Sequence, residues 1–393
     1  MIERMYILKG KERSMKKVLC AATALLFLAL WAGPLHAESD AALGERLTRE
    51  ARGVGFVVGT DSYSRLPQAL ESAAGGSVRV ETAVDPRETY GERPTPRRAS
   101  LLEFVSVARG CDNFCSYCIV PYVRGRERSR PAAAVVSEVE ALAKLGTVDV
   151  TLLGQNVNSY SDGDVRFADL LRLVSGVSGI ERVRFATSHP KDLTDRLIDA
   201  VAELPEVCEH VHLPVQSGSD DTLLAMNRVY TRDGYLELVR RIRERVPGVA
   251  LTTDIIVGFP GETESRFEET LSLMRDVRFD SAFMFRYSVR EGTSAASFAD
   301  DVPESEKVDR LETVIELQKG VTQELNSALV GRVVEVLLEG PSERDPDALF
   351  GRTRASKALV TKAPLELAGS TVPVRVESAS AWTLHGVVER DVS

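Results

Sequence analysis

Short apolar runs alternate with amphipathic stretches from residue 101 to residue 329. Six runs, several rich in β-branched residues, predict strands that begin near Glu103, Val148, Arg182, His210, Ala250 and Asp280. Apolar residues at helical spacing predict helices over Ala132–Leu145, Phe167–Val174, Leu193–Leu204, Arg232–Val246, Thr263–Val277 and Glu304–Ala328. Strands that alternate with helices form a parallel sheet. We therefore expect an α/β domain over residues 101–329, a six-unit partial barrel of the TIM type. An open doubly wound sheet fits the same periodicity. In both folds the active site lies at the carboxyl ends of the strands.

The period of the apolar positions changes to two from Gly331 onward. Short strands are predicted at Val333–Leu338, Ala358–Val360, Val372–Val376 and Trp382–Val388, with turn-forming residues between them. Residues 330–393 are therefore expected to form a small all-β barrel, in the size class of the OB-like oligonucleotide-binding barrels.

The first hundred residues follow a different pattern. Within residues 1–40, the segment Met15–Ala37 has a basic start, a short apolar run and small residues at its end, the layout of a secretory signal peptide. The alternative is a mispredicted start in front of a cytosolic protein. The run is too short for a comfortable transmembrane helix, so we expect no stable membrane association. Residues 41–74 suit a small α/β fragment, with a helix at 43–47 and a strand at 55–59. Residues 75–100, rich in Gly and Pro, suit a linker.

The composition is that of an ordinary globular protein and gives no overall basic signal. Hydrophobic residues make up 44% of the 393 residues, and the formal net charge is -9. A nucleic-acid contact would therefore depend on local patches. One candidate is the run Arg124, Arg126 and Arg128, interrupted by Glu127. Charge runs are usually solvated surfaces, but this run follows a cysteine loop directly, where it also suits phosphate contact.

The five cysteines fit a disulfide framework poorly, because their number is odd and three lie within eight residues. Cys111, Cys115 and Cys118 form a C-x3-C-x2-C loop just after the first predicted strand. Each thiolate can bind one iron of a 4Fe-4S cluster, which leaves the fourth iron open for the amino and carboxylate groups of S-adenosylmethionine (SAM). A structural zinc site needs four ligands, and a ferredoxin cluster a fourth cysteine. Three unrelated thiols are the remaining alternative. Cys208 stands alone and is expected to be a small buried residue.

Five sequence runs carry a resemblance to a known family. They are Gly110–Gly125, which contains the cysteine loop, Leu152–Tyr160, Thr187–Pro190, His212–Ser219 and Asp254–Glu262. With them the chain resembles the radical SAM methylthiotransferases over roughly three quarters of its length. It is most similar to the tRNA 2-methylthio-isopentenyladenosine synthases, the MiaB type. The branch that acts on threonylcarbamoyladenosine is the nearer competitor.

The resemblance implies a fold, a reaction and partners. The small barrel would be a TRAM domain. The enzyme would add a methylthio group to an isopentenyl-type adenosine beside the anticodon, using a 4Fe-4S cluster and SAM. Its partners would be the tRNA anticodon stem-loop and a reducing electron donor such as flavodoxin. We expect a cytoplasmic monomer, with export as the alternative if Met15–Ala37 is a genuine signal peptide.

The family also carries an N-terminal domain with three further cysteines that bind an auxiliary 4Fe-4S cluster. Residues 41–74 would be a remnant of that domain. This chain does not support the auxiliary cluster, because Cys20 is its one cysteine before the loop. A catalytically impaired tRNA-binding remnant is therefore a further hypothesis.

The resemblance also assigns candidate binding residues. The turn Gly154, Gln155 and Asn156 would hold the methionine part of SAM. Ser188, Gln216 and Gly258 fall just past other strand ends and are expected to line the same mouth. Tyr117 would pack on the adenine or cover the cluster. In the small barrel, the candidate RNA-binding cations are Arg352, Arg354 and Lys357. Phe350 or Trp382 could stack on a base, although we expect Trp382 to be a core residue.

Overall fold

The computed structural model describes residues 46–47, 49–50, 56–74, 79–82, 85, 87–89 and 100–389. The chain divides into two compact units, residues 1–88 and 89–393. Cys20 and the signal-like segment lie outside the described residues, as does most of the helix expected at 43–47. None of the helices in the described ranges is both long and apolar enough to cross a membrane.

The first unit contains a small parallel strand pair. β1 (Phe56–Val58), which confirms the strand expected at 55–59, pairs with β2 (Arg79–Glu81). Helix α3 (Leu66–Ala74) connects the two strands. β2 lies inside the linker that we expected at 75–100, so that part of the prediction was wrong. The intervening Gly-rich stretch resembles a linker in composition, but a strand as short as β2 has too weak a pattern to be read there.

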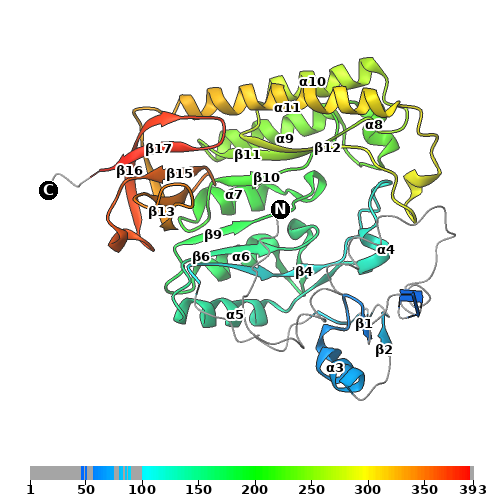
Figure 1. Ribbon diagram of the computed structural model, residues 1–393, viewed down its shortest axis with the longest axis horizontal. Coiled ribbons are helices and arrows are strands. Elements are labelled where there is room, and N and C mark those ends of the chain that lie inside the picture. The colour runs from blue at the N-terminus through cyan, green and yellow to red at the C-terminus, as the bar shows by residue number, and fades with distance from the viewer. Residues whose placement is uncertain are drawn as a thin grey trace. The chain divides into compact units, whose positions relative to one another are not determined.

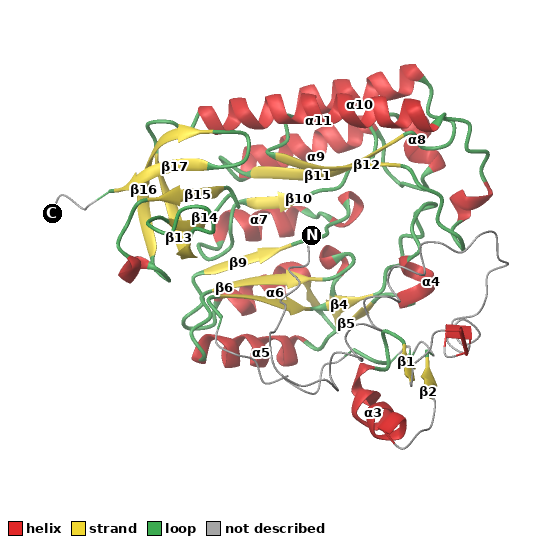
Figure 2. Ribbon diagram, in the orientation of Figure 1, coloured by secondary structure: helices red, strands yellow, loops and turns green. Residues whose placement is uncertain are grey.

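The second unit begins with a parallel sheet, whose strands appear one below another in Figures 1 and 2. Its first half pairs β3, β6 and β9, and its second half pairs β10, β11 and β12. A parallel bridge between Val183 and Val207 links the halves. The strands are β3 (Leu102–Ser106), β6 (Asp149–Leu153), β9 (Arg182–Phe185), β10 (His210–His212), β11 (Ala250–Val257) and β12 (Ser281–Arg286). The spatial order follows the chain order without reversal, which confirms the partial barrel over the doubly wound alternative.

Helices cover the outer face of this sheet. They are α5 (Ala132–Lys144), α6 (Phe167–Ser175), α7 (Asp195–Glu203), α8 (Asp220–Ala225), α9 (Arg232–Arg245), α10 (Glu264–Val277) and α11 (Glu304–Ser327). Alternate strand residues such as Val105, Leu152 and Ile255 pack with them in one buried core. The residues between those positions face the inside of the partial barrel, because side chains alternate along a strand.

A small insertion after β3 carries the cysteine loop. β4 (Ala108–Arg109) pairs antiparallel with β5 (Arg128–Ser129), and α4 (Val120–Arg124) lies between them. The loop from residue 110 to residue 118 therefore leaves the sheet at the carboxyl end of its first strand, as expected.

The C-terminal residues 331–389, all of them described, form a closed five-stranded barrel. The strand order is β13 (Val333–Pro341), β14 (Leu349–Thr353), β15 (Ala358–Thr361), β17 (Leu384–Val388) and β16 (Thr371–Ala379). Four of these strands confirm the predictions. β14 was missed.

Two buried arginines join the small barrel to the amino-terminal ends of the sheet strands. Arg182 donates to the Arg352 carbonyl at 2.8 Å and pairs with Glu335 at 2.8 Å. Arg184 donates to the carbonyls of Thr353, at 3.0 Å, and Arg354, at 2.8 Å. The two domains of this unit are thus fixed to each other at the end of the sheet opposite the cysteine loop.

Candidate active site

The cysteine loop begins with a turn that requires glycine. Gly110 has a φ of +73°, and a Cβ there would lie 2.2 Å from the Arg126 carbonyl oxygen. Its N–H donates to the Gln155 side-chain oxygen at 2.7 Å. Gln155 follows the neighbouring strand β6, so this bond sets the position of the loop relative to the second strand end.

The middle of the loop is tied to the segment after α8. The Ser116 hydroxyl donates to the Ala225 carbonyl at 2.8 Å, and the Ser116 N–H donates to the Met226 carbonyl at 3.0 Å. The Asn227 side-chain amide donates to the Phe114 carbonyl at 2.9 Å. Phe114 itself has a positive φ of 46°, uncommon outside glycine, which this bond helps to hold.

Arg228, which the sequence patterns did not reveal, is buried beside the loop. Its guanidinium donates to the Cys115 sulfur at 3.2 Å, to the Tyr230 hydroxyl at 2.8 Å and to the Pro214 carbonyl at 2.9 Å. Because Arg228 is buried and each nitrogen of its guanidinium has a hydrogen-bond partner, this cation is held at a fixed distance from the Cys115 thiol.

The three thiols suit a multi-iron cluster better than a single metal ion. All are free, with Cys111 and Cys115 buried and Cys118 half-buried. Within the described ranges, no three His, Cys, Asp or Glu side chains converge on a point that could hold one ion. In a cubane each sulfur binds a different iron, so such convergence is not required. Burial raises the pKa values of the Cys111 and Cys118 thiols. A bound metal has the opposite effect on these pKa values, since it deprotonates a coordinating thiol outright.

Buried polar atoms without partners lie at the neighbouring strand ends. Asn156 follows β6 and donates to Asp192 at 2.7 Å, but its side-chain oxygen has no hydrogen-bond partner among the described residues. The same is true of the Ser188 hydroxyl, which follows β9. Buried polar groups are normally paired, so two such atoms at one mouth fit a polar ligand there.

Two further expected residues, Gln216 and Gly258, have left-handed backbone at strand ends. Gln216 has a φ of +73° and exchanges backbone hydrogen bonds with β11. Gly258 has a φ of +68°, and a Cβ there would meet the Lys307 side chain at 2.3 Å. Thr187, next to Ser188, has a φ of +71° and was not singled out by the sequence. Such strained residues cluster at ligand sites.

Tyr117 packs at the inner side of the loop. It contacts the buried cluster of Met226, Phe259, Tyr287 and Ala295. Burial raises the pKa of its hydroxyl well above the ordinary value. The ring thus adds apolar surface beside the cysteine loop.

Comparisons with known proteins place the chain in a family. The radical SAM superfamily matches residues 105–274, and the TRAM domain matches residues 327–388. The tRNA-2-methylthio-N(6)-dimethylallyladenosine synthase of Moorella thermoacetica is 47% identical over 356 residues, which cover 88% of this chain and 78% of that protein. The chain belongs to the radical SAM methylthiotransferase family. The synthase of the same name from Clostridium botulinum is 42% identical over 384 residues, covering 97% of this chain and 83% of that protein. A solved radical SAM methyltransferase from Kitasatospora setae has 20% identity and a TM-score of 0.46, and covers 58% of this chain and 50% of that chain.

As a member of this family the chain uses a 4Fe-4S cluster and SAM. The thiols and the unpaired polar atoms of Asn156 and Ser188 fit these two groups. Both atoms can hydrogen-bond to the polar end of a bound ligand, while the three sulfurs leave one iron of a cubane open.

The basic run beside the loop is only partly available to RNA. Arg126 is exposed but pairs with Asp112 at 2.7 Å and lies over the Phe114 ring. Arg128 donates to the Arg124 carbonyl at 2.8 Å.

The candidate cations of the TRAM domain are largely committed to protein carboxylates. Arg354 pairs with Glu209 at 2.8 Å, and Lys357 pairs with Asp280 at 2.7 Å. Both contacts lie between the TRAM domain and the partial barrel, so a phosphate would have to displace half-buried ion pairs. Arg352 pairs with Glu339 at 2.6 Å within the small barrel but remains partly exposed. Of the three, Arg352 alone keeps an accessible side chain.

The prediction that Trp382 is a core residue was wrong. Its side chain is 71% exposed, because the strand begins at Leu384 and Trp382 lies in the turn before it. Phe350 is half-buried, with the Arg352 guanidinium 5.1 Å from its ring centroid. Cys208 is buried, as expected, and burial raises its pKa to about 11.

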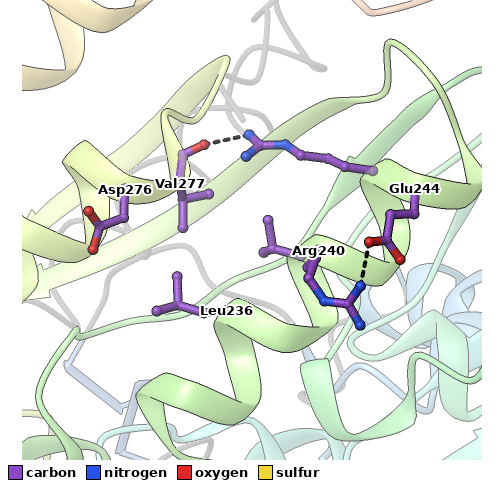
Figure 3. Close-up of a pocket in the computed structure, with 7 residues that line it drawn as sticks. Leu236, Arg240, Glu244, Asp276 and Val277 are labelled. Atoms are coloured by element: carbon purple, nitrogen blue, oxygen red, sulfur yellow. Dashed lines mark hydrogen bonds and ion pairs between the residues drawn. The ribbon is translucent and has the colours of Figure 1, made fainter.

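A separate hollow of about 350 Å³ lies between α9 and α10 (Figure 3). Arg240, on its wall, pairs with Glu244, and Asp276 pairs with Arg232 at 2.7 Å. The lining comes from the two helices alone and includes no strand end, so this hollow is not part of the candidate active site.

Proposed function

We propose that the chain transfers a methylthio group to position 2 of an N6-dimethylallyl-adenosine beside the anticodon of tRNA. The main support is the loop of three free thiols at the carboxyl end of β3. The chain is also 47% identical to a protein named tRNA-2-methylthio-N(6)-dimethylallyladenosine synthase. Cys111, Cys115 and Cys118 would hold the cluster. When bound, the cluster and SAM together supply one-electron cleavage of a sulfonium bond, which yields a deoxyadenosyl radical.

The chain's own residues would bind SAM, position the cysteine loop and exclude water from the site. Gln155 fixes the start of the loop through Gly110, and Asn156 and Ser188 offer polar atoms to the methionine part of SAM. Gln216 and Gly258 bring backbone to the same mouth. The half-buried Tyr117 ring adds apolar surface beside the cysteines, which would limit side reactions of a radical with water.

The partners follow from the same proposal. The tRNA anticodon stem-loop would contact Arg124, Arg126 and Arg128 beside the mouth and Arg352 on the TRAM domain. A reducing donor such as flavodoxin would deliver the electron. The protein would act as a cytoplasmic monomer, since a reduced cluster and tRNA both occur in a reducing compartment. The domain limits would be 101–329 for the radical SAM domain and 330–393 for the TRAM domain.

Anaerobic reconstitution of the full chain tests the proposal. We expect about four irons per chain and cleavage of SAM to deoxyadenosine. With prenylated tRNA, added sulfide as the sulfur source and a second SAM as the methyl donor, we expect a 2-methylthio nucleoside detected by mass spectrometry. Replacing Cys111, Cys115 and Cys118 together by alanine should abolish all three. Cys208→Ala is the matched control and should retain them, because Cys208 is buried outside the loop.

Two outcomes would contradict this function. One is a chain that takes up zinc in place of iron. The other is iron binding that persists in the triple cysteine variant. Product formed on threonylcarbamoyl-adenosine tRNA and not on prenylated tRNA would transfer the assignment to the other branch of the family.

A further inference from the structure

The inner face of the partial barrel exposes aromatic side chains near its open edges. β3 and β12 are the two edge strands of the sheet as described; on this face β3 has one phenylalanine and β12 has two. Phe104 on β3 is 57% exposed, and Phe283 and Phe285 on β12 are 51% and 52% exposed. Large apolar side chains that stay exposed side by side, as Phe283 and Phe285 do on one strand face, often mark a surface that a ligand or partner covers.

Phe283 packs against His212, a side chain whose own position is fixed by polar contacts on the neighbouring strands. The His212 ring packs edge-on against Phe283, with 6.0 Å between centroids and an interplanar angle of 76°. His212 lies 3.4 Å from Asp254 and 3.0 Å from the Thr252 hydroxyl. These partners fix the imidazole, so the phenylalanine ring is pre-positioned although it is exposed.

Phe285 lies closer to the cysteine loop than Phe283 does. In the register of the sheet it is opposite Ile256, which packs on the same buried cluster as Tyr117. At the opposite end of the sheet, Arg184 pairs with Asp149 at 2.9 Å and donates to carbonyls of the TRAM domain. The two phenylalanines thus lie on the inner face between the strand ends that carry the cysteine loop and the end that contacts the TRAM domain.

We propose that Phe283 and Phe285 are specificity-determining residues that bind the N6-dimethylallyl group of the substrate adenine. This inference rests on the proposed function. Position 2 and the N6 substituent project from different corners of the purine ring. With carbon 2 facing the cysteine loop, the five-carbon chain has to be accommodated elsewhere, and the inner face of β12 offers the exposed apolar surface beside the loop. An unprenylated adenine would leave both rings in water, which makes them a means of discrimination.

Equilibrium binding of two anticodon stem-loop RNAs tests the inference. The RNAs are identical except for the dimethylallyl group, and the full reconstituted chain is titrated with SAM present. We expect the wild type to prefer the prenylated RNA by about tenfold or more, since burial of several methylene-sized groups is involved. Phe283→Ala and Phe285→Ala should each reduce this preference severalfold while leaving the affinity for the unprenylated RNA unchanged.

The matched control is Phe298→Ala, which removes another partly exposed phenylalanine, one that lies outside the inner face. It should keep the full preference. Both test positions are exposed, so unchanged melting temperatures are expected and should be confirmed. A wild type that binds both RNAs equally, or variants that keep the preference, would overturn this inference and leave the proposed function intact. A wild type that binds neither RNA would overturn the proposed function and this inference with it.

Discussion

Replacement of Arg228 by methionine should make the reconstituted cluster harder to reduce. The Arg228 guanidinium is buried and lies 3.2 Å from the Cys115 sulfur. Burial lowers the pKa of Arg228, but the neighbouring tyrosine hydroxyls and the Cys115 thiol outweigh it and raise that pKa above its ordinary value. The residue is therefore a permanent cation. Reduction adds one negative charge to the cluster, and a fixed cation stabilises the reduced form.

The size of the effect follows from Coulomb's law. A unit charge about 5 Å from the added electron, at an effective dielectric constant of about 20, contributes roughly 3 kcal/mol. For a one-electron couple this corresponds to a midpoint potential lower by about 130 mV in Arg228→Met, because tenfold in the equilibrium constant equals about 59 mV. Arg228→Lys keeps the charge and loses the forked geometry, so it should restore part of the difference.

The assay is a potentiometric titration of the reduced cluster, followed by electron paramagnetic resonance. Iron content must be measured beside it, because Arg228 also donates to the Pro214 carbonyl and its loss could loosen the loop. Arg240→Met is the control, since Arg240 forms ion pairs on the far helical surface. A midpoint potential that is unchanged in Arg228→Met, at full iron content, would refute the electrostatic argument.

Two other predictions concern stability. Arg184→Met should lower the free energy of unfolding by about 3–5 kcal/mol, because it leaves the buried Asp149 carboxylate without its cation; a change below about 1 kcal/mol in chemical denaturation would contradict this. Because of His189, the free energy of unfolding should decrease as the pH falls. Burial lowers its pKa from 6.5 to about 2, so below pH 6.5 the unfolded chain takes up a proton that the folded chain does not. Between pH 7 and pH 5 this costs about 2 kcal/mol. His189→Gln should flatten the pH dependence by that amount, and an unchanged slope would exclude His189 as its source.

Most of the second unit could be predicted from sequence because buried parallel strands appear as short β-branched runs. The six strand starts and six of the helices were correct to within about two residues, the normal uncertainty of helix ends. β14 was missed because its sequence, LFGRT, contains Gly351, which usually weakens a strand. The structure explains the glycine, since a Cβ there would lie 2.2 Å from the Leu337 carbonyl oxygen.

The candidate site was predictable where spacing along the chain carries the signal. The three cysteines form such a pattern. Arg228 could not be found in this way, because it contacts Cys115 across 113 residues and belongs to no local motif. Trp382 was misassigned because an aromatic residue in an alternating run suggests a core position, whereas the chain is still in a turn there.

The TRAM domain is mounted on the sheet by Arg182 and Arg184 at the end away from the cysteines. A β-strand advances about 3.3 Å per residue, so β11, with its eight residues, separates the two ends by roughly 26 Å. Because the attachment is rigid, the distance between the cysteine loop and the small barrel is fixed. If RNA binds as proposed, an RNA long enough to reach from the cysteine mouth to the small barrel would gain both contacts at once, and a shorter fragment would make one of them.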